Sequence, residues 1–425
     1  MQFPNSLRSL RSPKFRRYYI GQTVSMIGTW IQSVAVMWLA YRLSGSTWFT
    51  GLIGFLASAP NLFLAPFAGV LGDRVSRRKV LITVLSLMAV QSVALAVVSG
   101  LNLMTMPLLA ALALFSGICS AFEIPMRQSI FIQLLDNRED LPNAIAMNSM
   151  LMNGTRLIGP SIGGVLIASF GETVCFAVNA VSYAAVVGAL LGLKANPRAR
   201  RAPSHPLHDL ADGWRYSMGQ LPVRRMLITL AAVSMTISPY ATLMPAIAVK
   251  TFGRGAETVG LFIGAVGLGA FIAAVQLAMR PSIRGLGKWI GVATVVAGVG
   301  AIGFGFSRWM TLSCVMLVLE GFGMFMVGAT CNTILQTMVD EDQRSRVLSY
   351  YSMFFVGTAP IGHYTAGWVA DHIGAPLTFV AGGVICLAAG IAFTFQLDTF
   401  RAHLRKAYVA RGIIPSLEDT RAINP

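Results

Sequence analysis

The chain has 425 residues, of which 55% are hydrophobic and 12% are charged. Soluble proteins have about 25% charged residues, so this composition excludes a water-soluble globular protein, and disorder is excluded because it requires low hydrophobicity and high charge. A net charge of +16 could indicate a nucleic-acid-binding protein, but the charges lie between long apolar segments, which indicates an integral membrane protein that binds no nucleic acid.

Twelve largely apolar segments are each long enough to cross about 30 Å of hydrocarbon as a helix. They lie near residues 19–42, 48–71, 80–100, 107–125, 143–168, 174–193, 224–249, 258–279, 288–306, 309–333, 347–370 and 376–396. The sequence therefore predicts an all-α membrane protein with two six-helix bundles. We expect these bundles at 1–193 and 223–396, a cytoplasmic linker at 194–222 with a short surface helix around residues 207–218, and a cytoplasmic tail at 397–425.

The connections between these spans alternate between basic and nearly uncharged. Most of the 33 Lys and Arg residues fall on one side, and the other side has only Arg42, Lys250, Arg254 and Arg308. Cytoplasmic connections carry the excess of positive charge. The pattern therefore predicts a multi-pass protein of a bacterial inner membrane, with both termini in the cytoplasm.

The two halves resemble each other at a constant offset of 203 residues. This offset pairs Gly164 with Gly367 and Gly171 with Gly374. It also pairs Gln133 with Gln336, Ser149-Met150 with Ser352-Met353, and Gly154-Thr155 with Gly357-Thr358. Parallel repeats of six helices are typical of transporters whose halves move around a site near the membrane midplane.

The short connection between the second and third spans reads Gly69-Val-Leu-Gly-Asp73-Arg74-Val-Ser76-Arg77-Arg78. It resembles the G-x-x-x-D-[RK]-x-G-[RK]-[RK] signature of the major facilitator superfamily, with Ser76 in place of the second glycine. The resemblance implies a transporter rather than an enzyme. It also implies that Asp73, Arg74, Arg77 and Arg78 belong to a gate that latches the two halves in the outward-open state. The matching segment of the second half, 280–288, is degenerate, so we do not expect a symmetric latch.

Glu123 ends the fourth span at the same membrane depth as this connection. An ion pair with Arg77 is the simpler interpretation and makes Glu123 a gate residue. The alternative is that Glu123 carries protons.

The fifth span contains the packing motif Gly159-Pro160-Ser-Ile-Gly163-Gly164. It resembles part of the fifth-helix motif of drug/proton antiporters, although Ala146 and Thr155 replace the upstream glycines. Small residues let helices approach closely. They do not explain Arg156, because a cation in mid-span costs about 2.5–3.5 kcal/mol and marks a functional site by default.

Glu320, roughly midway along the tenth span, is the deepest acid of the chain. Proton coupling requires a carboxyl group within the membrane that can gain and lose a proton. We interpret Glu320 and Arg156 as the coupling pair, with a permanent structural role for Glu320 as the alternative.

Polar side chains follow one face of the first span and one face of the seventh. In the superfamily the first, fourth, seventh and tenth helices line the cavity, which implies a substrate cavity lined by Gln22, Ser25, Thr29, Gln32, Ser234, Ser238 and Thr242. Pro239 and Pro245 are expected to break the seventh helix. Hydrogen bonding between helices without a substrate is the alternative, and His363 with Tyr364 fits either lining or packing.

The segments Gly28–Ser46, Arg344-Ser-Arg346-Val and Asp371-His-Ile-Gly374 resemble the branch of enterobactin exporter-like and macrolide efflux-like proteins. The resemblance implies a monomeric proton antiporter that exports small amphipathic molecules, drug-like or siderophore-like, by alternating access. We expect no cofactor and no metal ion, since neither a Walker A nor an H-E-x-x-H motif occurs. An importer, and a non-transporting scaffold or receptor on the same fold, are the alternatives.

Overall fold

The computed structural model describes residues 5–135, 138–192, 206–280 and 285–410. Within these ranges the regular secondary structure is entirely helical. The mean hydropathy of the chain, +0.65, matches this picture of long apolar helices.

Six long helices form the N-terminal bundle. They are α1 (Pro13–Ser44), α2 (Thr47–Arg74), α3 (Arg77–Gly100), α4 (Met106–Gln133), α5 (Leu141–Phe170) and α6 (Glu172–Leu191), with short 3-10 turns at Asn5–Arg11 and Arg138–Asp140. These are the first six predicted spans. Several of the helices extend beyond the apolar segments at the end where the basic connections lie.

The other six predicted spans form the C-terminal bundle, and two of them consist of two helices each. The helices are α8 (Leu221–Thr236), α9 (Tyr240–Lys250), α10 (Ala256–Ala278), α11 (Leu286–Phe306), α12 (Met310–Met338), α13 (Glu341–Phe355), α14 (Ala359–Ile373) and α15 (Ala375–Phe395). The seventh span breaks at residues 237–239 and the eleventh at 356–358. Pro239 lies at the first break as predicted, but Pro245 is accommodated inside α9, so the prediction of a second break there was wrong.

Two further helices flank the C-terminal bundle. The surface helix expected in the connecting segment is present as α7 (Pro206–Gly219). The last helix, α16 (Leu397–Ala410), packs back onto the bundle through Phe400 and Tyr408, which are buried. The segment after the twelfth span is therefore a packed helix for at least this length.

Local residue chemistry sets where helices begin and end. Ser12 accepts a hydrogen bond from the backbone N–H of Phe15 and caps α1, whose first residue is Pro13. Gly171 and Gly374, which the 203-residue offset pairs, occupy equivalent turns after α5 and α14 with φ of 79° and 88°. A backbone with this φ favours glycine because glycine has no Cβ, so the repeat seen in the sequence is also a repeat of backbone conformation.

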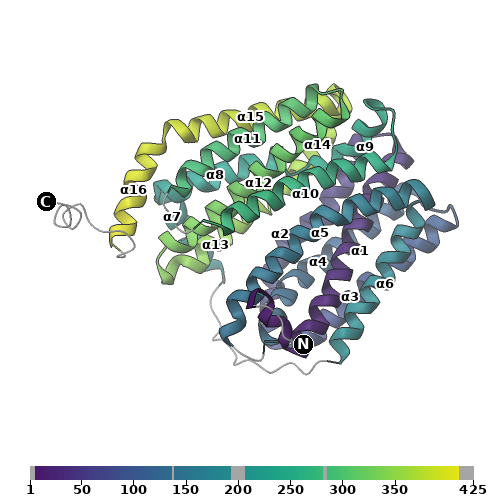
Figure 1. Ribbon diagram of the computed structural model, residues 1–425, viewed down its shortest axis with the longest axis horizontal. Coiled ribbons are helices and arrows are strands. Elements are labelled where there is room, and N and C mark those ends of the chain that lie inside the picture. Colours follow the sequence, from purple (N-terminus) through teal and green to yellow (C-terminus); the bar gives the residue numbers. More distant parts are fainter. Residues whose placement is uncertain (1–4, 136–137, 193–205, 281–284, 411–425) are drawn as a thin grey trace.

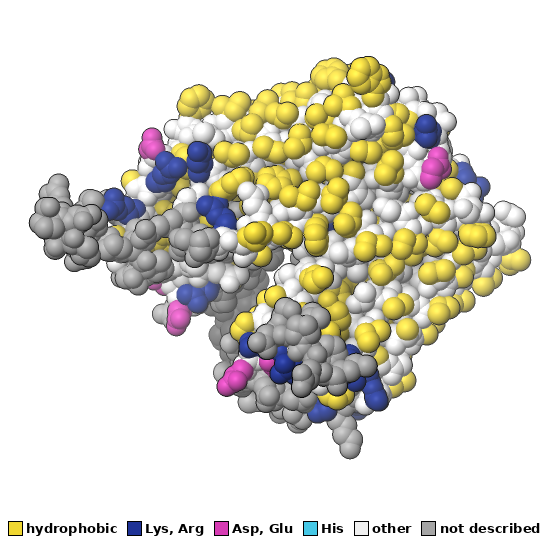
Figure 2. All heavy atoms as spheres, viewed as in Figure 1, with side chains coloured by type: hydrophobic (Ala, Val, Ile, Leu, Met, Phe, Trp, Pro, Cys, Tyr) yellow, Lys and Arg dark blue, Asp and Glu magenta, His cyan; other side chains and the backbone are white. Residues whose placement is uncertain are grey.

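The surface fits a bilayer. Ten helical segments of the described chain are long and apolar enough to cross a membrane. The fifth span and the broken eleventh span are not among the ten; α5 contains Asn148, Asn153 and Arg156. Figure 2 shows hydrophobic side chains over the flank of both bundles, with charged side chains toward the two ends.

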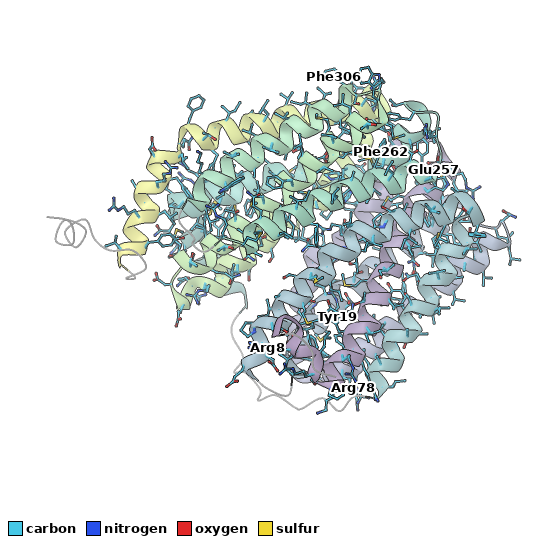
Figure 3. The ribbon with its side chains drawn as sticks, in the orientation of Figure 1. Arg8, Tyr19, Arg78, Glu257, Phe262 and Phe306 are labelled. Carbon is cyan, nitrogen blue, oxygen red and sulfur yellow. The ribbon has the colours of Figure 1, made fainter. Side chains whose placement is uncertain are left out.

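Helix α1 begins, and α2 meets α3, at one end of the molecule. We call it the basic end because Arg77, Arg78 and Lys79 lie there. The opposite end is called the far end. In Figure 3, Arg8, Tyr19 and Arg78 lie toward the basic end of the N-terminal bundle. Glu257 and Phe306 lie toward the far end of the C-terminal bundle. The two ends therefore differ in charge, as the sequence pattern predicts.

The bundles meet along two crossings, α5 with α10 and α2 with α14. Each crossing has a glycine on both helices. A Cβ on Gly260 would come within 2.7 Å of the Gly164 Cα, and a Cβ on Gly367 within 2.8 Å of the Gly51 Cα. Gly164 and Gly367 are a pair of the 203-residue repeat, so the two crossings are related by the repeat.

Among the described glycines, the close contacts between the bundles lie in the far half and the middle of the molecule. The far-end contacts include Gly164 with Gly260, and those near the middle include Gly267 with Leu157 and Gly54 with His363. Toward the basic end the bundles separate (Figure 1). The space-filling view shows the surface notched between them there (Figure 2).

Candidate functional site

Arg156 lies where the two bundles meet near mid-depth. Its guanidinium carbon is 5.5 Å from the centroid of the Trp30 ring on α1, and its charge acts on Tyr240 at the start of α9. The Nε atom is buried without a hydrogen-bond partner. Among the described residues no acid lies within ion-pair distance of Arg156.

Glu320 is fully buried inside the C-terminal bundle. Helix α11 approaches it so closely that a Cβ on Gly300 would lie 3.1 Å from the Glu320 Cα. Neither carboxyl oxygen has a hydrogen-bond partner within the described chain. Tyr240 lies within electrostatic range of both Glu320 and Arg156. The two charged residues form no ion pair with each other. The geometry therefore does not support Arg156 as a direct counter-ion of Glu320.

The polar stripe of the first span faces the interior of the N-terminal bundle for most of its length. Gln22 and Ser25 are buried. Gln32 donates to the Gln91 Oε1 at 3.1 Å. Its own Oε1 accepts hydrogen bonds from Ser92 Oγ at 2.7 Å and from Asn179 Nδ2 at 2.9 Å. The structure thus gives Gln32 a hydrogen-bond network between α1, α3 and α6.

The same stripe also lines a recess of about 120 Å³ in this bundle. Its polar lining comes from α1, α3, α4 and α6 and includes Thr29, Gln32, Ser33, Gln91, Ser116, Ser120 and Tyr183. Thr29 and Ser33 are exposed, which indicates that the recess is open to its surroundings. A water molecule occupies about 30 Å³ in the liquid, so the recess has room for a few waters or for one small polar group.

Polar residues of the seventh span hold the two broken spans together. Ser234 donates to the Phe355 carbonyl at 2.6 Å, at the break between α13 and α14. Thr242 Oγ1 lies 2.6 Å from His363 Nδ1, and Ser238 is half-buried in the break between α8 and α9. A helix break inside a membrane protein needs such partners because lipid offers none.

The residues predicted as a gate lie at the basic end. Arg78 donates to the carbonyls of Leu190 and Leu191 at 2.8 and 2.7 Å, and so satisfies the last turn of α6. Arg77 begins α3. The side chains of Asp73 and Arg74 lie outside the described residues.

Glu123 pairs with a different cation from the one expected. Its Oε1 accepts a hydrogen bond of 2.6 Å from the Arg127 Nε, one turn further along α4. The partner that the structure shows for Glu123 is thus Arg127, where an ion pair with Arg77 was expected. Arg127 lies on the same helical face at the i+4 position, which equal membrane depth alone could not reveal.

The Gly159-Pro160-x-x-Gly163-Gly164 motif contacts two neighbours at once. A Cβ on Gly159 would meet the Trp30 side chain at 2.5 Å, and one on Gly163 would meet the Ile31 Cα at 3.1 Å, both on α1. The Pro160 carbonyl and Gly164 face α10 of the other bundle. The motif thus lies between its own bundle and the opposite one.

Sequence reasoning missed a contact across the far end. Asp371, at the end of α14, accepts hydrogen bonds of 2.8 Å from the Thr47 backbone N–H, from Thr47 Oγ1 and from Ser46 Oγ. A carboxylate of one bundle therefore caps the first turn of α2 in the other. The signal was the Asp371-His-Ile-Gly374 segment, noted only as a resemblance.

The environment of Asp371 matches this role. Its partial burial alone would raise the pKa of the carboxyl. The hydrogen bonds from Ser46, Thr47 and the Trp48 backbone outweigh that effect and hold the pKa of Asp371 below its usual value. The charged form is thus the one that the capping geometry favours.

Comparison with known proteins places the chain in a family. The family described as "Transmembrane secretion effector" matches residues 5–410. The staphyloferrin A transporter of Staphylococcus aureus is 24% identical over 384 residues, which cover 89% of this chain and 95% of that protein. The enterobactin exporter EntS of Escherichia coli O1:K1 is 25% identical over 394 residues, covering 92% and 93%.

Solved structures share the fold. The nucleoside transporter NupG superposes with a TM-score of 0.68 at 12% identity, over 90% of this chain and 98% of that one. A bacterial homologue of the human lysosomal transporter Spinster gives a TM-score of 0.67 at 16% identity, over 92% and 98%. The chain is therefore a membrane transporter of the major facilitator superfamily, and it belongs to the family described as "Transmembrane secretion effector".

Proposed function

We propose that this protein is a monomeric, proton-coupled exporter of small amphipathic molecules of the siderophore-like class, working by alternating access in a bacterial inner membrane. The names of its relatives support the substrate class, since one transports staphyloferrin A and another exports enterobactin. The excess of Lys and Arg at the basic end supports a cytoplasmic position for that end and for both termini.

The observation that carries this proposal is the uneven contact between the bundles. Close helix crossings join the bundles in the far half, while toward the basic end the surface is notched between them (Figure 2). We infer that a molecule in the cytoplasm approaches Arg156 from this side, and that the far-end crossings bar a molecule outside. Export then requires the bundles, at 1–193 and 223–396, to rock about the middle, with the 194–222 segment connecting them.

In the alternate state the basic end has to close. We assign this to the gate residues Asp73, Arg74, Arg77, Arg78 and Glu123, whose role rests on the signature of the superfamily. Glu123 would act there through its pair with Arg127. The cavity residues predicted for the first and seventh spans would form the polar walls, with Thr29 and Gln32 at the recess.

Glu320 is our candidate for the proton-carrying group. An ionised carboxylate without partners costs several kcal/mol to bury, so protonation of Glu320 stabilises the present arrangement of α10, α11 and α12 around it. Release of the proton would favour an arrangement that hydrates or pairs the carboxylate. This difference between two states is what coupling to a proton gradient needs.

Inside-out membrane vesicles test the proposal, with radiolabelled enterobactin and staphyloferrin A as probes. Energised vesicles should accumulate at least one probe, and a protonophore should abolish the accumulation. Glu320→Gln should prevent proton-driven accumulation but leave exchange of probe across the membrane. Glu257→Gln, at an exposed acid of the far end that caps the Gly255 backbone, is the matched control and should transport normally.

Full proton-driven accumulation by Glu320→Gln would remove Glu320 from the mechanism. Accumulation only in right-side-out vesicles would show an importer. If no probe and no proton flux responded in either orientation, the protein would be a scaffold or receptor rather than a transporter.

A further inference from the structure

We propose that Arg156 and Trp30 form an anion-binding site, and that the transported molecule presents there a carboxylate or catecholate attached to a planar ring. The inference rests on the proposed transport function and specifies the substrate class of that same site. It separates the two substrate classes considered from the sequence, because many drugs are cations and the site would repel them.

The charges near mid-depth favour an anion. Glu123, in α4, is neutralised by Arg127. Glu320 is enclosed in the C-terminal bundle and forms no ion pair with Arg156. A cation at this depth costs about 2.5–3.5 kcal/mol, and no described side chain offsets this cost with a negative charge. A bound anion would do so.

The geometry around Arg156 favours a planar anion. The guanidinium carbon lies over the Trp30 ring, 5.5 Å from its centroid, a contact that attracts a guanidinium to an aromatic face. The Nε–H is buried and has no acceptor. A carboxylate or catecholate has two oxygens and can accept two parallel hydrogen bonds from one edge of a guanidinium group. An anion with a single acceptor atom cannot.

The position of Arg156 along α5 favours a transported anion over a structural one. Gly164, which meets α10 at the far-end crossing, lies eight residues further along the helix, or about 12 Å. On the other side the surface is notched between the bundles toward the basic end (Figure 2). An anion on Arg156 would therefore lie between the closed far-end crossing and the end at which the bundles separate.

Neighbouring residues of both bundles would sense the bound anion. Trp30 and Arg156 belong to the N-terminal bundle, whereas Tyr240, on which the Arg156 charge acts, belongs to α9. Tyr240 also lies in range of Glu320. Neutralising Arg156 with a substrate would change the potential at Tyr240 and Glu320, which gives a direct electrostatic link between substrate and proton.

Binding of matched small probes to the purified full-length protein tests the inference. Salicylate and its neutral analogue salicylamide have the same ring and hydroxyl and differ in charge, and isothermal titration gives their dissociation constants. The wild type should bind salicylate at least about tenfold more tightly. Arg156→Gln should reduce this preference to about one, and Arg156→Lys, which keeps the charge without the planar edge, should retain part of it.

Arg224→Gln is the control, because it removes one exposed cation at the basic end and should leave the preference unchanged. Trp30→Leu should weaken salicylate binding through the loss of the ring that contacts the guanidinium. An equal preference in Arg156→Gln and wild type, or tighter binding of salicylamide by the wild type, would overturn the inference. Either result would leave the vesicle transport of enterobactin or staphyloferrin A intact, so failure here is distinct from failure of the proposed function.

Discussion

Arg127 and Glu123 form a pair of opposite charges near the basic end of α4, and both side chains are about nine-tenths shielded from solvent. Tyr18 of α1 is buried beside them, within range of both charges. Buried pairs of this kind add little over apolar residues, but removing one partner leaves an uncompensated charge.

Arg127→Leu should therefore destabilise the protein by about 3–5 kcal/mol, seen as a lower unfolding temperature in detergent. The double variant Glu123→Leu/Arg127→Leu should recover most of the loss because no lone charge remains. Arg401→Leu, which breaks an exposed pair with Asp398, should have little effect. Equal unfolding temperatures for the single and double variants would contradict the account.

At the residue scale the sequence identified the charged residues but not their neighbours. Arg156 and Glu320 were recognisable because ionisable residues deep in apolar segments are rare. The pairing of Gln32 with Gln91 and Asn179 joins three helices and depends on how these helices rotate against each other. Hydropathy and spacing do not determine those rotations.

Among the elements, α2 and α14 form the crossing where a side chain of one bundle caps a helix of the other. Backbone N–H groups in the first turn of a helix have no acceptor within the helix, and the Asp371 carboxylate accepts from the Thr47 N–H and Oγ1 at the start of α2. A negative charge at this position also interacts favourably with the helix dipole. Helix caps contribute about 0.5–2 kcal/mol. This contact can exist only while the far end is closed.

Asp371→Asn should therefore raise the population that is open at the far end, by about fivefold if the cap contributes about 1 kcal/mol. Spin labels at Asn102 and Arg308, exposed turns of the two bundles at that end, report the change as a longer distance in pulsed electron resonance. Asp371→Glu, which keeps the charge, is the control. An unchanged distance distribution in Asp371→Asn would show that the cap does not hold the far end closed.

The pH dependence of this contact follows from the lowered pKa of Asp371. A carboxyl with a depressed pKa stabilises its contact fully above its usual pKa of about 3.9. The stabilisation is lost only as the pH falls through the depressed value. The far-end distance should thus not change between pH 8 and pH 5 through Asp371. A change in that range that disappears in Asp371→Asn would contradict the assignment.

The elements themselves were largely predictable. Long apolar segments, basic connections and the turn glycines predict helices whose ends agree with the structure to within a few residues in the apolar parts. The breaks were harder to predict. Pro239 lies at the break of its span, and Ser234 and Thr242 on either side of it bond to the eleventh span, whereas Pro245 falls in a helix that accommodates it.

For the whole molecule, the superfamily fold was predictable from the signature at 69–78 and from the 203-residue repeat. The conformational state was not. Which end is closed depends on a small difference between two packings of the same helices, and glycine crossings such as Gly164 with Gly260 can form in one of them and separate in the other.

The central claim is that the two ends open alternately. Two pairs of spin labels measure this directly in a variant without the native cysteines: Lys79 with Lys288 at the basic end, and Asn102 with Arg308 at the far end, all exposed positions. Gly164→Leu should block the far-end crossing, because a Cβ at this position would lie 2.8 Å from the Ala256 carbonyl oxygen and 2.8 Å from the Gly260 Cα. Gly154→Leu is the matched control, because a Cβ there would meet nothing within 4 Å. Alternating access predicts that Gly164→Leu lengthens the far-end distance and shortens the basic-end distance, while Gly154→Leu changes neither; a basic-end distance that stays fixed or lengthens as the far end opens would contradict it.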